Sequence, residues 1–365
     1  MRIARAQTFE LRIPFTDGSS GLGLMPTAWT HLDMVLLRLE TEDGLVGWGD
    51  GFAYGCRSAT HAALRDMVLP QVLGAEVTNP AEFMRTLQQR LHLQGRFGIT
   101  SFALSAVDIA LWDLAAKARD TSVAALLCAQ AGTTARTRLP AYASLVRYGD
   151  PALVDRFTRK ACDEGYACIK LHEIELAAIE AGRAAAPAPI RLVTDVNCNW
   201  TPDQAETLMV EMHRMGLYWV EEPIYPPDAA EALGRLQSRH RVSIASGENA
   251  ATVEGFAAIA KTIDFLQPSV TKVGGISEFV SVCELASAHG KRVMPHSPYF
   301  GPGYWATAHL MAARPECELF EMLYIEPQDW LDSRIPLPRH GELSLPDGPG
   351  LGFEPDPALL ERHAA

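Results

Sequence analysis

Long apolar runs are missing from this 365-residue sequence. No segment approaches the ~20 apolar residues that a membrane-spanning helix needs. The first residues, MRIARAQTFELRIPF, lack the extended apolar core of a secretory signal peptide and are typical of an amphipathic strand. These two absences predict a cytoplasmic protein with no membrane partner.

Positive charge is scarce as well. The 32 Lys and Arg residues face 44 Asp and Glu residues, which gives a formal net charge of −12. A chain this acidic repels phosphate backbones and anionic lipid, so we expect no nucleic-acid partner. An anionic small substrate would need local cations, or a metal ion, to reverse the field inside its binding site.

The seven cysteines include no CxxC pair and no Cys/His spacing typical of zinc. Most lie among apolar neighbours, as in LCAQA, YACIK and SVCEL, which predicts buried reduced thiols rather than disulfides or a reactive cysteine. The first expected barrel strand does not end in HxH, so a zinc amidohydrolase is disfavoured.

The first part of the chain, 1–128, is predicted to form an α+β domain. Residues 1 to about 60 are typical of a strand meander, with a hairpin turn at Glu42-Asp43-Gly44. From about 60 to 128 the spacing becomes helical, and TSFALSAVDIALWDLAAKA is the clearest candidate for an amphipathic helix. The Gly/Ser-rich segment 18–30 is predicted to be a mobile loop.

The region 139–325 alternates short β-rich runs with helix-compatible stretches. The runs are PAYASL, ACIKLH, IRLVTDVN, LYWVEEPI, VSIASGEN, DFLQPSV, KRVMPHS and CELFEML. Such alternation predicts parallel strands with crossover helices, and eight of them close into a (β/α) barrel. The Pro- and Gly-rich tail, 326–365, is predicted to return to the first domain.

Polar residues recur at the ends of these expected strands, spaced 21 to 27 residues from one strand to the next. The series is Lys170 with His172, Asp195 with Asn197, Glu221 with Glu222, then Glu248, Ser269, His296 and Glu321. Residues at the same point of each βα unit reach the same rim of a barrel, where barrel enzymes build their active sites. The register, rather than any one motif, therefore predicts an active site.

Asp195, Glu221 and Glu248 come from three consecutive expected strands. Each alone could cap a helix or form an ion pair. Three converging carboxylates repel one another unless a cation joins them, and an all-oxygen set suits a hard ion such as Mg²⁺. We therefore predict a metal site.

Lys170 and His172 are two residues apart on one strand and point to the same side. Either could act as a base, and His296 faces them from across the barrel. Such groups could move a proton between the faces of a planar intermediate, or serve as a base and an acid. A salt bridge for Lys170, a supporting role for His172 and a structural role for His296 are the plainer alternatives.

The chain resembles the enolase superfamily, in its mandelate racemase and muconate lactonizing branch. The resemblance covers nearly the whole length, through ETEDGLVGWGDG, SAVDIALWDLAAK, IKLH, TDVN, VEEP, SGEN, TKVGG and MPH. It implies an α+β capping domain over a (β/α)7β barrel, and one Mg²⁺ per subunit held by Asp195, Glu221 and Glu248. It also implies a homo-oligomer, and a Lys or His base working with Mg²⁺ to stabilise an ene-diolate.

Two positions depart from the family pattern. The usual Lys-x-Lys motif is here Lys170-Leu171-His172, and Ser269 stands where relatives have a Lys base or an Asp that orients the seventh-strand histidine. A serine can hydrogen-bond to His296 but cannot stabilise an imidazolium as a carboxylate does. Lys272, three residues beyond Ser269, is not assigned as the base.

Further site residues are implied by the resemblance alone. Glu321 matches an acid near the substrate carboxylate, which could donate a hydrogen bond if its pKa were raised. Trp29, His31 and Tyr54 lie in or after the N-terminal loop, where the family places specificity residues.

The leading functional hypothesis is dehydration of an acid sugar, a small carboxylate, to a 2-keto-3-deoxy acid. Racemisation, epimerisation or cycloisomerisation through the same enolate is the alternative. A Schiff-base aldolase using Lys170 or Lys272 would leave the three carboxylates without a role, and a non-enzymatic barrel would leave the metal site without one.

Overall fold

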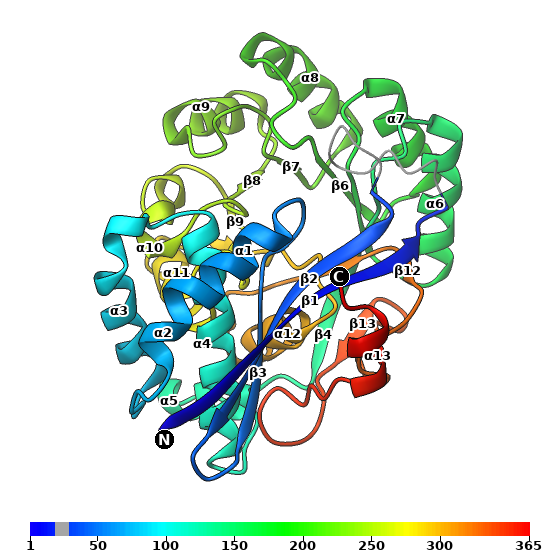
Figure 1. Cartoon of the computed structure of the whole chain (residues 1–365). Helices are drawn as coiled ribbons and strands as arrows, with labels where there is room; N and C mark the ends of the chain where they lie inside the picture. Colours follow the sequence, from blue (N-terminus) through cyan, green and yellow to red (C-terminus); the bar gives the residue numbers. More distant parts are fainter. Residues whose placement is uncertain (19–28) are drawn as a thin grey trace.

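The computed structural model describes residues 1–18 and 29–365. The loop expected over 18–30 falls largely on residues 19–28, which lie outside this described part. The remaining chain forms a small strand-and-helix cap that lies against a larger barrel (Figure 1).

The cap is built on an antiparallel sheet. β1 (Ile3–Thr16) pairs with β2 (His31–Thr41), which pairs with β3 (Val46–Gly51) across the predicted turn at 42–45. The helical part follows as α1 (Arg57–Ala63), a π-helical turn (Leu64–Val68), α2 (Leu69–Val72), α3 (Pro80–Arg90), a 3-10 turn (His92–Gln94), α4 (Ile99–Lys117) and α5 (Val123–Ala131).

The helix α4 is buried on all sides, so the expectation of an amphipathic helix is wrong. It lies between the cap sheet and the barrel, and β3 approaches it through glycines: a Cβ atom at Gly51 would lie 2.6 Å from the Phe102 carbonyl oxygen. Its aspartates are buried with partners, and Asp113 accepts hydrogen bonds from Trp48 N at 2.9 Å and Leu351 N at 2.7 Å. The helix is long and apolar enough to cross a membrane, but 89% of that stretch is packed inside the protein, as in a core helix.

Eight parallel strands form the barrel, as the sequence predicted. They are β4 (Arg138–Ser144), β5 (Cys168–Leu171), β6 (Arg191–Asp195), β7 (Trp219–Glu221), β8 (Ile244–Ser246), β9 (Phe265–Leu266), β10 (Arg292–Val293) and β11 (Phe320–Leu323). Each pairs with the next from β4 to β10, and β11 pairs with β4. A parallel bridge between Val293 and Cys317 joins β10 to the segment before β11 and closes the ring.

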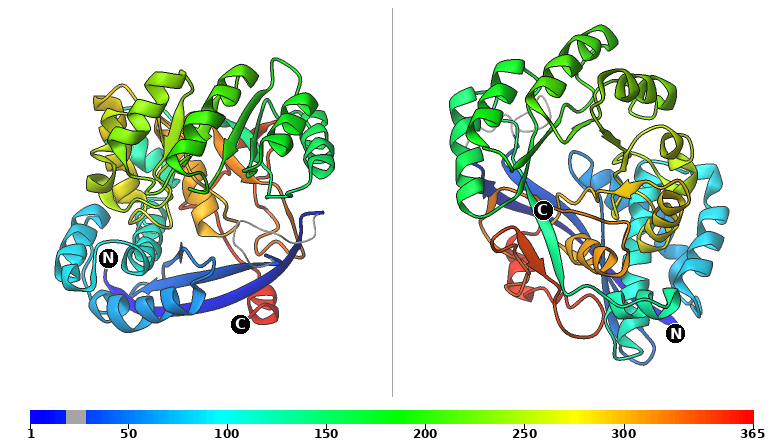
Figure 2. Two further views of the ribbon diagram at one scale, coloured as in Figure 1. Left: turned by 90° about the horizontal axis from the view of Figure 1, so that it is seen from above. Right: turned by 180° about the vertical axis from the view of Figure 1, so that it is seen from behind.

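Crossover helices cover the outside of the barrel (Figure 2). They are α6 (Pro151–Asp163), α7 (Leu176–Ala185), α8 (Pro202–Met215), α9 (Ala230–His240), α10 (Thr252–Phe256) with a 3-10 turn (Ile259–Lys261), α11 (Ile276–Ala288) and α12 (Pro302–Ala313). The predicted (β/α)7β barrel with an α+β cap is therefore confirmed.

The last part of the chain returns to the cap. β12 (Glu326–Pro327) pairs with β1, and β13 (Glu342–Ser344) runs antiparallel to β4. The terminal helix α13 (Pro357–Arg362) lies beside the cap sheet, where Arg12 N donates to His363 O at 2.9 Å (Figure 2). The division at 128, 139 and 326 stays a prediction.

The interior of the barrel begins with an apolar layer. Its side chains are Tyr142, Cys168, Val193, Trp219, Ala245, Phe265, Met294 and Leu319. Because side chains alternate along a strand, the residues two positions further on point into the same interior. That next layer holds five residues of the polar series that the sequence singled out, namely Lys170, Asp195, Glu221, His296 and Glu321.

Candidate active site

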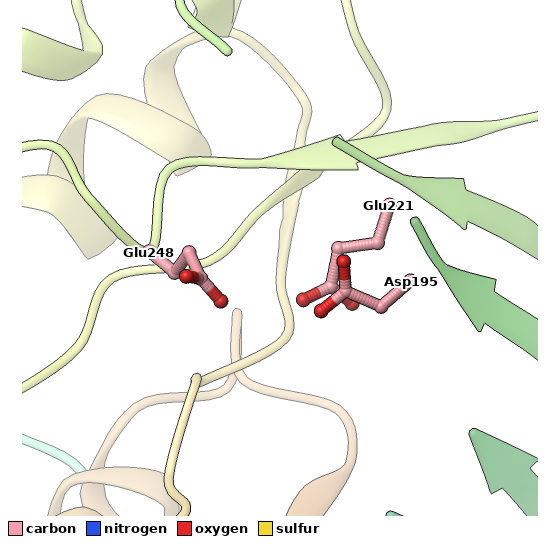
Figure 3. A group of neighbouring side chains, drawn as sticks. All are labelled: Asp195, Glu221 and Glu248. Carbon is pink, nitrogen blue, oxygen red and sulfur yellow. The ribbon is translucent and has the colours of Figure 1, made fainter. Parts of the chain in front are cut away.

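The three predicted metal ligands converge at the carboxyl ends of their strands (Figure 3). Asp195 ends β6 and is in register with Glu221, which ends β7. Glu248 follows β8 by two residues, and its carboxylate points towards the other two. One oxygen from each residue lies within 4.8 Å of the others.

This donor set fits a hard divalent cation. Asp195 and Glu221 are almost fully buried, the side chain of Glu248 is 12% exposed, and all three offer only oxygen ligands. Burial, with Asp195 next in importance, raises the pKa of Glu221 well above its usual value. A cation among these oxygens would remove that repulsion.

Lys170 is fully buried behind the carboxylates. Its Nζ lies 2.6 Å from Glu221 Oε1, 3.1 Å from Asp195 Oδ2 and 3.3 Å from Glu321 Oε1. Burial lowers the pKa of Lys170, but these carboxylates outweigh it and hold that pKa well above the usual value. Conversely, burial alone would raise the pKa of Asp195. The positive charges of Lys170 and His172 outweigh the effect of burial and lower the pKa of Asp195 to about 2.

Lys170 is therefore an ammonium in this arrangement. A lysine base needs a depressed pKa, and a cation that neutralised the surrounding carboxylates would shift the Lys170 pKa in that direction.

His172 points to the same side as Lys170, as predicted. Its Nδ1 contacts the Leu145 carbonyl oxygen, and its Nε2 lies 3.5 Å from Asp195 Oδ2. Because only a protonated Nδ1 can donate to a carbonyl oxygen, the neutral ring carries its lone pair on Nε2, the nitrogen nearer the carboxylates. Burial, with Lys170 next, lowers the pKa of His172 to about 4.

His296 faces the triad from the seventh strand. Its Nε2 lies 3.1 Å from Glu248 Oε2, and its Nδ1 lies 3.0 Å from Ser269 Oγ and 3.3 Å from the Tyr299 hydroxyl. Ser269 and Tyr299 also contact each other. Two hydroxyls thus lie beside Nδ1, where the family resemblance implied an acid or a lysine. Burial is the main reason that the pKa of His296 falls to about 3.

Glu321 is held as a carboxylate. Ser144 Oγ donates to its Oε1 at 2.8 Å, and Ser297 N donates to its Oε2 at 2.8 Å. Burial raises the pKa of Glu321, but Lys170 and these donors outweigh it, so the pKa is lowered. The hydrogen-bond donor role considered for Glu321 needs a raised pKa and has no support here.

A cavity of about 510 Å³ opens between the cap and the barrel rim. The polar side chains on its barrel side are Ser144, His172, Asp195, Asn197, Glu222, Glu248, Asn249, Thr271, Lys272, His296, Tyr299 and Glu321. The cap side is mainly apolar, with Trp29, Leu32, Met34, Phe52, Tyr54 and Phe102. A small acid would therefore meet its polar partners mainly at the barrel end.

Two of the three specificity candidates line this cavity. Trp29 and Tyr54 pack against each other with ring centroids 4.7 Å apart. His31 does not line it; its Nδ1 lies 2.8 Å from Thr30 Oγ1. Asn197 does line it, with its Oδ1 accepting from Arg147 Nη2 at 2.9 Å.

Lys272, Asn249 and Tyr299 are among the cavity residues that the sequence analysis did not assign to the site. Lys272 enters the site, where its Nζ donates to Asn249 Oδ1 at 2.6 Å. Asn249 directly follows Glu248 in SGEN, and Tyr299 lies three residues after His296, so proximity in sequence to predicted residues was the available signal. The face of Lys272 could not be read because β9 ends at Leu266, before the TKVGG segment.

Known proteins match this chain over its whole length. Residues 24–128 match the N-terminal domain model of mandelate racemase / muconate lactonizing enzyme, and residues 153–359 match the enolase C-terminal domain-like model. Relatives include D-galactarolactone cycloisomerase of Agrobacterium fabrum, 31% identical over 88% of both chains. Arabinonate dehydratase of Saccharolobus solfataricus is 26% identical over 95% of both.

Solved structures agree. A member of the enolase superfamily from Agrobacterium tumefaciens has a TM-score of 0.86 at 25% identity, covering 99% of both chains. A racemase from Streptomyces coelicolor with bound magnesium has a TM-score of 0.86 at 25% identity over the whole of both chains. With family models covering both the cap and the barrel, the chain belongs to the mandelate racemase / muconate lactonizing enzyme family of the enolase superfamily.

Proposed function

We propose that this enzyme uses one Mg²⁺ per subunit, held by Asp195, Glu221 and Glu248, to remove the proton next to the carboxylate of an acid sugar. We propose dehydration to a 2-keto-3-deoxy acid as its reaction. The observation that carries this is the meeting of the carboxylate triad, Lys170 and two histidines at the barrel end of one site. We further propose a cytoplasmic homo-oligomer.

When bound, the metal ion would act as a Lewis acid towards the substrate carboxylate, which makes the α-proton more acidic. Lys170 adds a buried positive charge behind the proposed metal ligands, 2.6 Å from Glu221 Oε1, and from there supports the negative charge that develops as the proton leaves. Lys170 does not line the cavity, so its role is electrostatic rather than that of the base.

His172 is the proposed base. Its Nε2 carries the lone pair, and the ring lines the cavity next to Asp195. After Nε2 takes the α-proton, the imidazolium is a strong acid, because burial depresses its pKa. It can therefore return that proton to the β-hydroxyl as the C–O bond breaks, so that water leaves and an enol remains. The enol then converts to the keto acid by proton transfer, for which His296 is the second available group.

Cycloisomerisation is the second candidate, because a relative 31% identical is a D-galactarolactone cycloisomerase. It begins with the same α-proton removal. Dehydration lowers the product mass by one water, whereas cycloisomerisation leaves the mass unchanged.

The test follows a pooled library of acid sugars, their lactones and anhydro-acids in D₂O by mass spectrometry, with Mg²⁺ and with EDTA. We expect Mg²⁺-dependent loss of water from at least one acid sugar. If no acid sugar loses water, metal-dependent deuterium uptake without dehydration would identify the isomerase. Full activity in EDTA with borohydride trapping of a lysine would identify a Schiff-base enzyme, and no exchange with any member would overturn the proposal.

A further inference from the structure

Glu248 is held differently from the other two predicted metal ligands. Asp195 and Glu221 end neighbouring strands, and the β-ladder fixes their register. Glu248 lies beyond the end of β8, after Gly247, whose φ of +121° turns the chain away from the strand direction. Its carboxylate therefore depends on side-chain contacts for its direction.

Asn249 links Glu248 to two other charged side chains, Glu222 and Lys272. Its Nδ2 donates to Glu248 Oε1 at 3.0 Å and to Glu222 Oε1 at 3.2 Å. Its Oδ1 accepts from Lys272 Nζ at 2.6 Å. A flipped amide would place its oxygen against two carboxylates and its NH₂ group against an ammonium, so the three contacts allow one orientation only.

Lys272 is held in place from the cap. Its Nζ lies 4.5 Å from the centroid of the Phe52 ring, which directly follows β3. On the main chain, Ser101 Oγ of α4 donates to Lys272 O at 2.6 Å, and Phe52 N donates to Thr271 O at 3.2 Å. The ammonium is buried, so the attraction between this cation and the ring is stronger than at an exposed site.

We infer that Asn249 and Lys272 are positioning residues for Glu248, and that Phe52 connects the cap to the metal site through them. The inference rests on the proposed metal site but not on the reaction. Groups that orient a metal ligand contribute to metal affinity although they do not touch the ion. Affinity for Mg²⁺ should therefore depend on a contact made by the cap.

A purely electrostatic effect of Lys272 has the opposite sign. Its Nζ lies 3.8 Å from Glu248 Oε1, close enough to repel a metal ion bound there. Removing only a repulsive charge would strengthen Mg²⁺ binding, whereas removing a support for Glu248 would weaken it. The direction of the change distinguishes the two roles.

The experiment measures the Kd of Mg²⁺ by titration calorimetry on the metal-stripped full chain, without substrate. We expect Asn249→Leu to weaken binding by about 10- to 100-fold. Lys272→Met should also weaken it, and Lys272→Arg, which keeps the charge and the donors, should recover most of the loss. Lys261→Met, which removes a lysine from an exposed position, controls for net charge.

Phe52→Leu tests the cap contact without changing any charge. We expect a Kd at least about two- to fivefold weaker, because part of a buried cation–π interaction is passed on to Glu248 through Lys272 and Asn249. Phe83→Leu is the matched control, since Phe83 packs against the core of the cap and does not line the cavity, and it should leave the Kd unchanged.

Unchanged binding in Asn249→Leu, or tighter binding in Lys272→Met, would overturn the inference, as would a wild-type chain that does not bind Mg²⁺. If a variant fails to fold by circular dichroism, Phe52→Leu still decides whether the cap contributes. The variants could show this pattern of Mg²⁺ binding while the wild-type protein catalyses no α-proton exchange. That result would support the inference and reject only the proposed reaction.

Discussion

Two neighbouring layers inside the barrel differ in almost every respect. The lower layer is apolar, and Trp219 and Phe265 pack within it at a centroid distance of 5.4 Å. The upper layer consists of buried charges. Lys170 and Glu221 belong to it, and each stands two residues beyond an apolar-layer residue of its own strand. Because side chains alternate along a β-strand, residues two positions apart both point into the interior. Burial alone therefore does not tell whether a residue serves the stability of the fold or the reaction. The lower layer contributes packing, and the upper layer requires a cation to compensate its carboxylates.

Substitutions in the upper layer should have the largest effect on kcat. Lys170→Met removes the buried positive charge that lies against three carboxylates, and we expect kcat to fall by about 10²- to 10³-fold. The measurement is steady-state kinetics with saturating Mg²⁺ on protein whose fold is checked by circular dichroism. A kcat within a few-fold of wild type would show that this charge does not support the transition state.

Substitutions in the lower layer should instead lower the free energy of unfolding. Phe265→Ala leaves a hole against Trp219 and Tyr218, and should lower the free energy of unfolding by about 3–5 kcal/mol. Urea unfolding followed by tryptophan fluorescence measures the loss. Folded Phe265→Ala protein should retain its kcat; a large loss of kcat at unchanged stability would mean that the two layers are not separable.

A buried histidine away from the charged layer provides a pH test. His309 on α12 accepts from Ala124 N through Nδ1 at 3.2 Å and donates from Nε2 to Leu351 O at 2.9 Å, and burial lowers its pKa to about 4. The unfolded chain, with a pKa near 6.5, takes up the proton first as the pH falls. His309 therefore stabilises the fold above pH ~6.5, and this contribution is lost towards pH ~4, by on the order of 3 kcal/mol.

The measurement for His309 compares urea unfolding of wild type and His309→Gln between pH 7 and pH 4, where the glutamine amide stays neutral. The wild type should lose stability more steeply over this range. Equal slopes would show that the ring is not held neutral by burial.

The smallest expected effect concerns the hydroxyl pair beside His296. Tyr299→Phe removes one of the two hydroxyls near Nδ1 and leaves the Ser269 contact, so we expect kcat to fall about two- to tenfold, as for a single hydrogen bond. Ser269→Ala should have a similar effect, and the double variant should lose more than either. If neither single variant changes kcat or its pH profile, the pair does not orient His296.

The sequence predicted the barrel and the meeting of three carboxylates because both follow from periodicity. Asp195, Glu221 and Glu248 recur at one point of successive βα units, and parallel strands bring such points to one rim. The cap positions were harder: Trp29 and Tyr54 line the cavity and His31 does not, although all three lie close together in the sequence. Trp29 and Tyr54 lie in irregular segments, where no period says which side chain faces inward, whereas His31 begins β2 and alternates with the cavity-lining Leu32.

The helix α4 shows where local pattern was insufficient. Its sequence suggested one buried face, but the cap sheet and the barrel cover it from both sides. Whether the polar face of a helix meets solvent or a second layer depends on residues far away in the chain. Here the backbone N–H groups of Trp48 and Leu351 donate hydrogen bonds to the buried carboxylate of Asp113.

The sequence by itself determined the order of strands and helices, the interior alternation and the set of carboxylates, because each depends on spacing within one or two units. Only the tertiary structure decided that Lys170 lies among three carboxylates, that two hydroxyls flank His296, and that Phe52 of the cap reaches Lys272 of the barrel. Protonation and side-chain direction depend on distances between charges and on burial, and those arise when segments distant in sequence pack together.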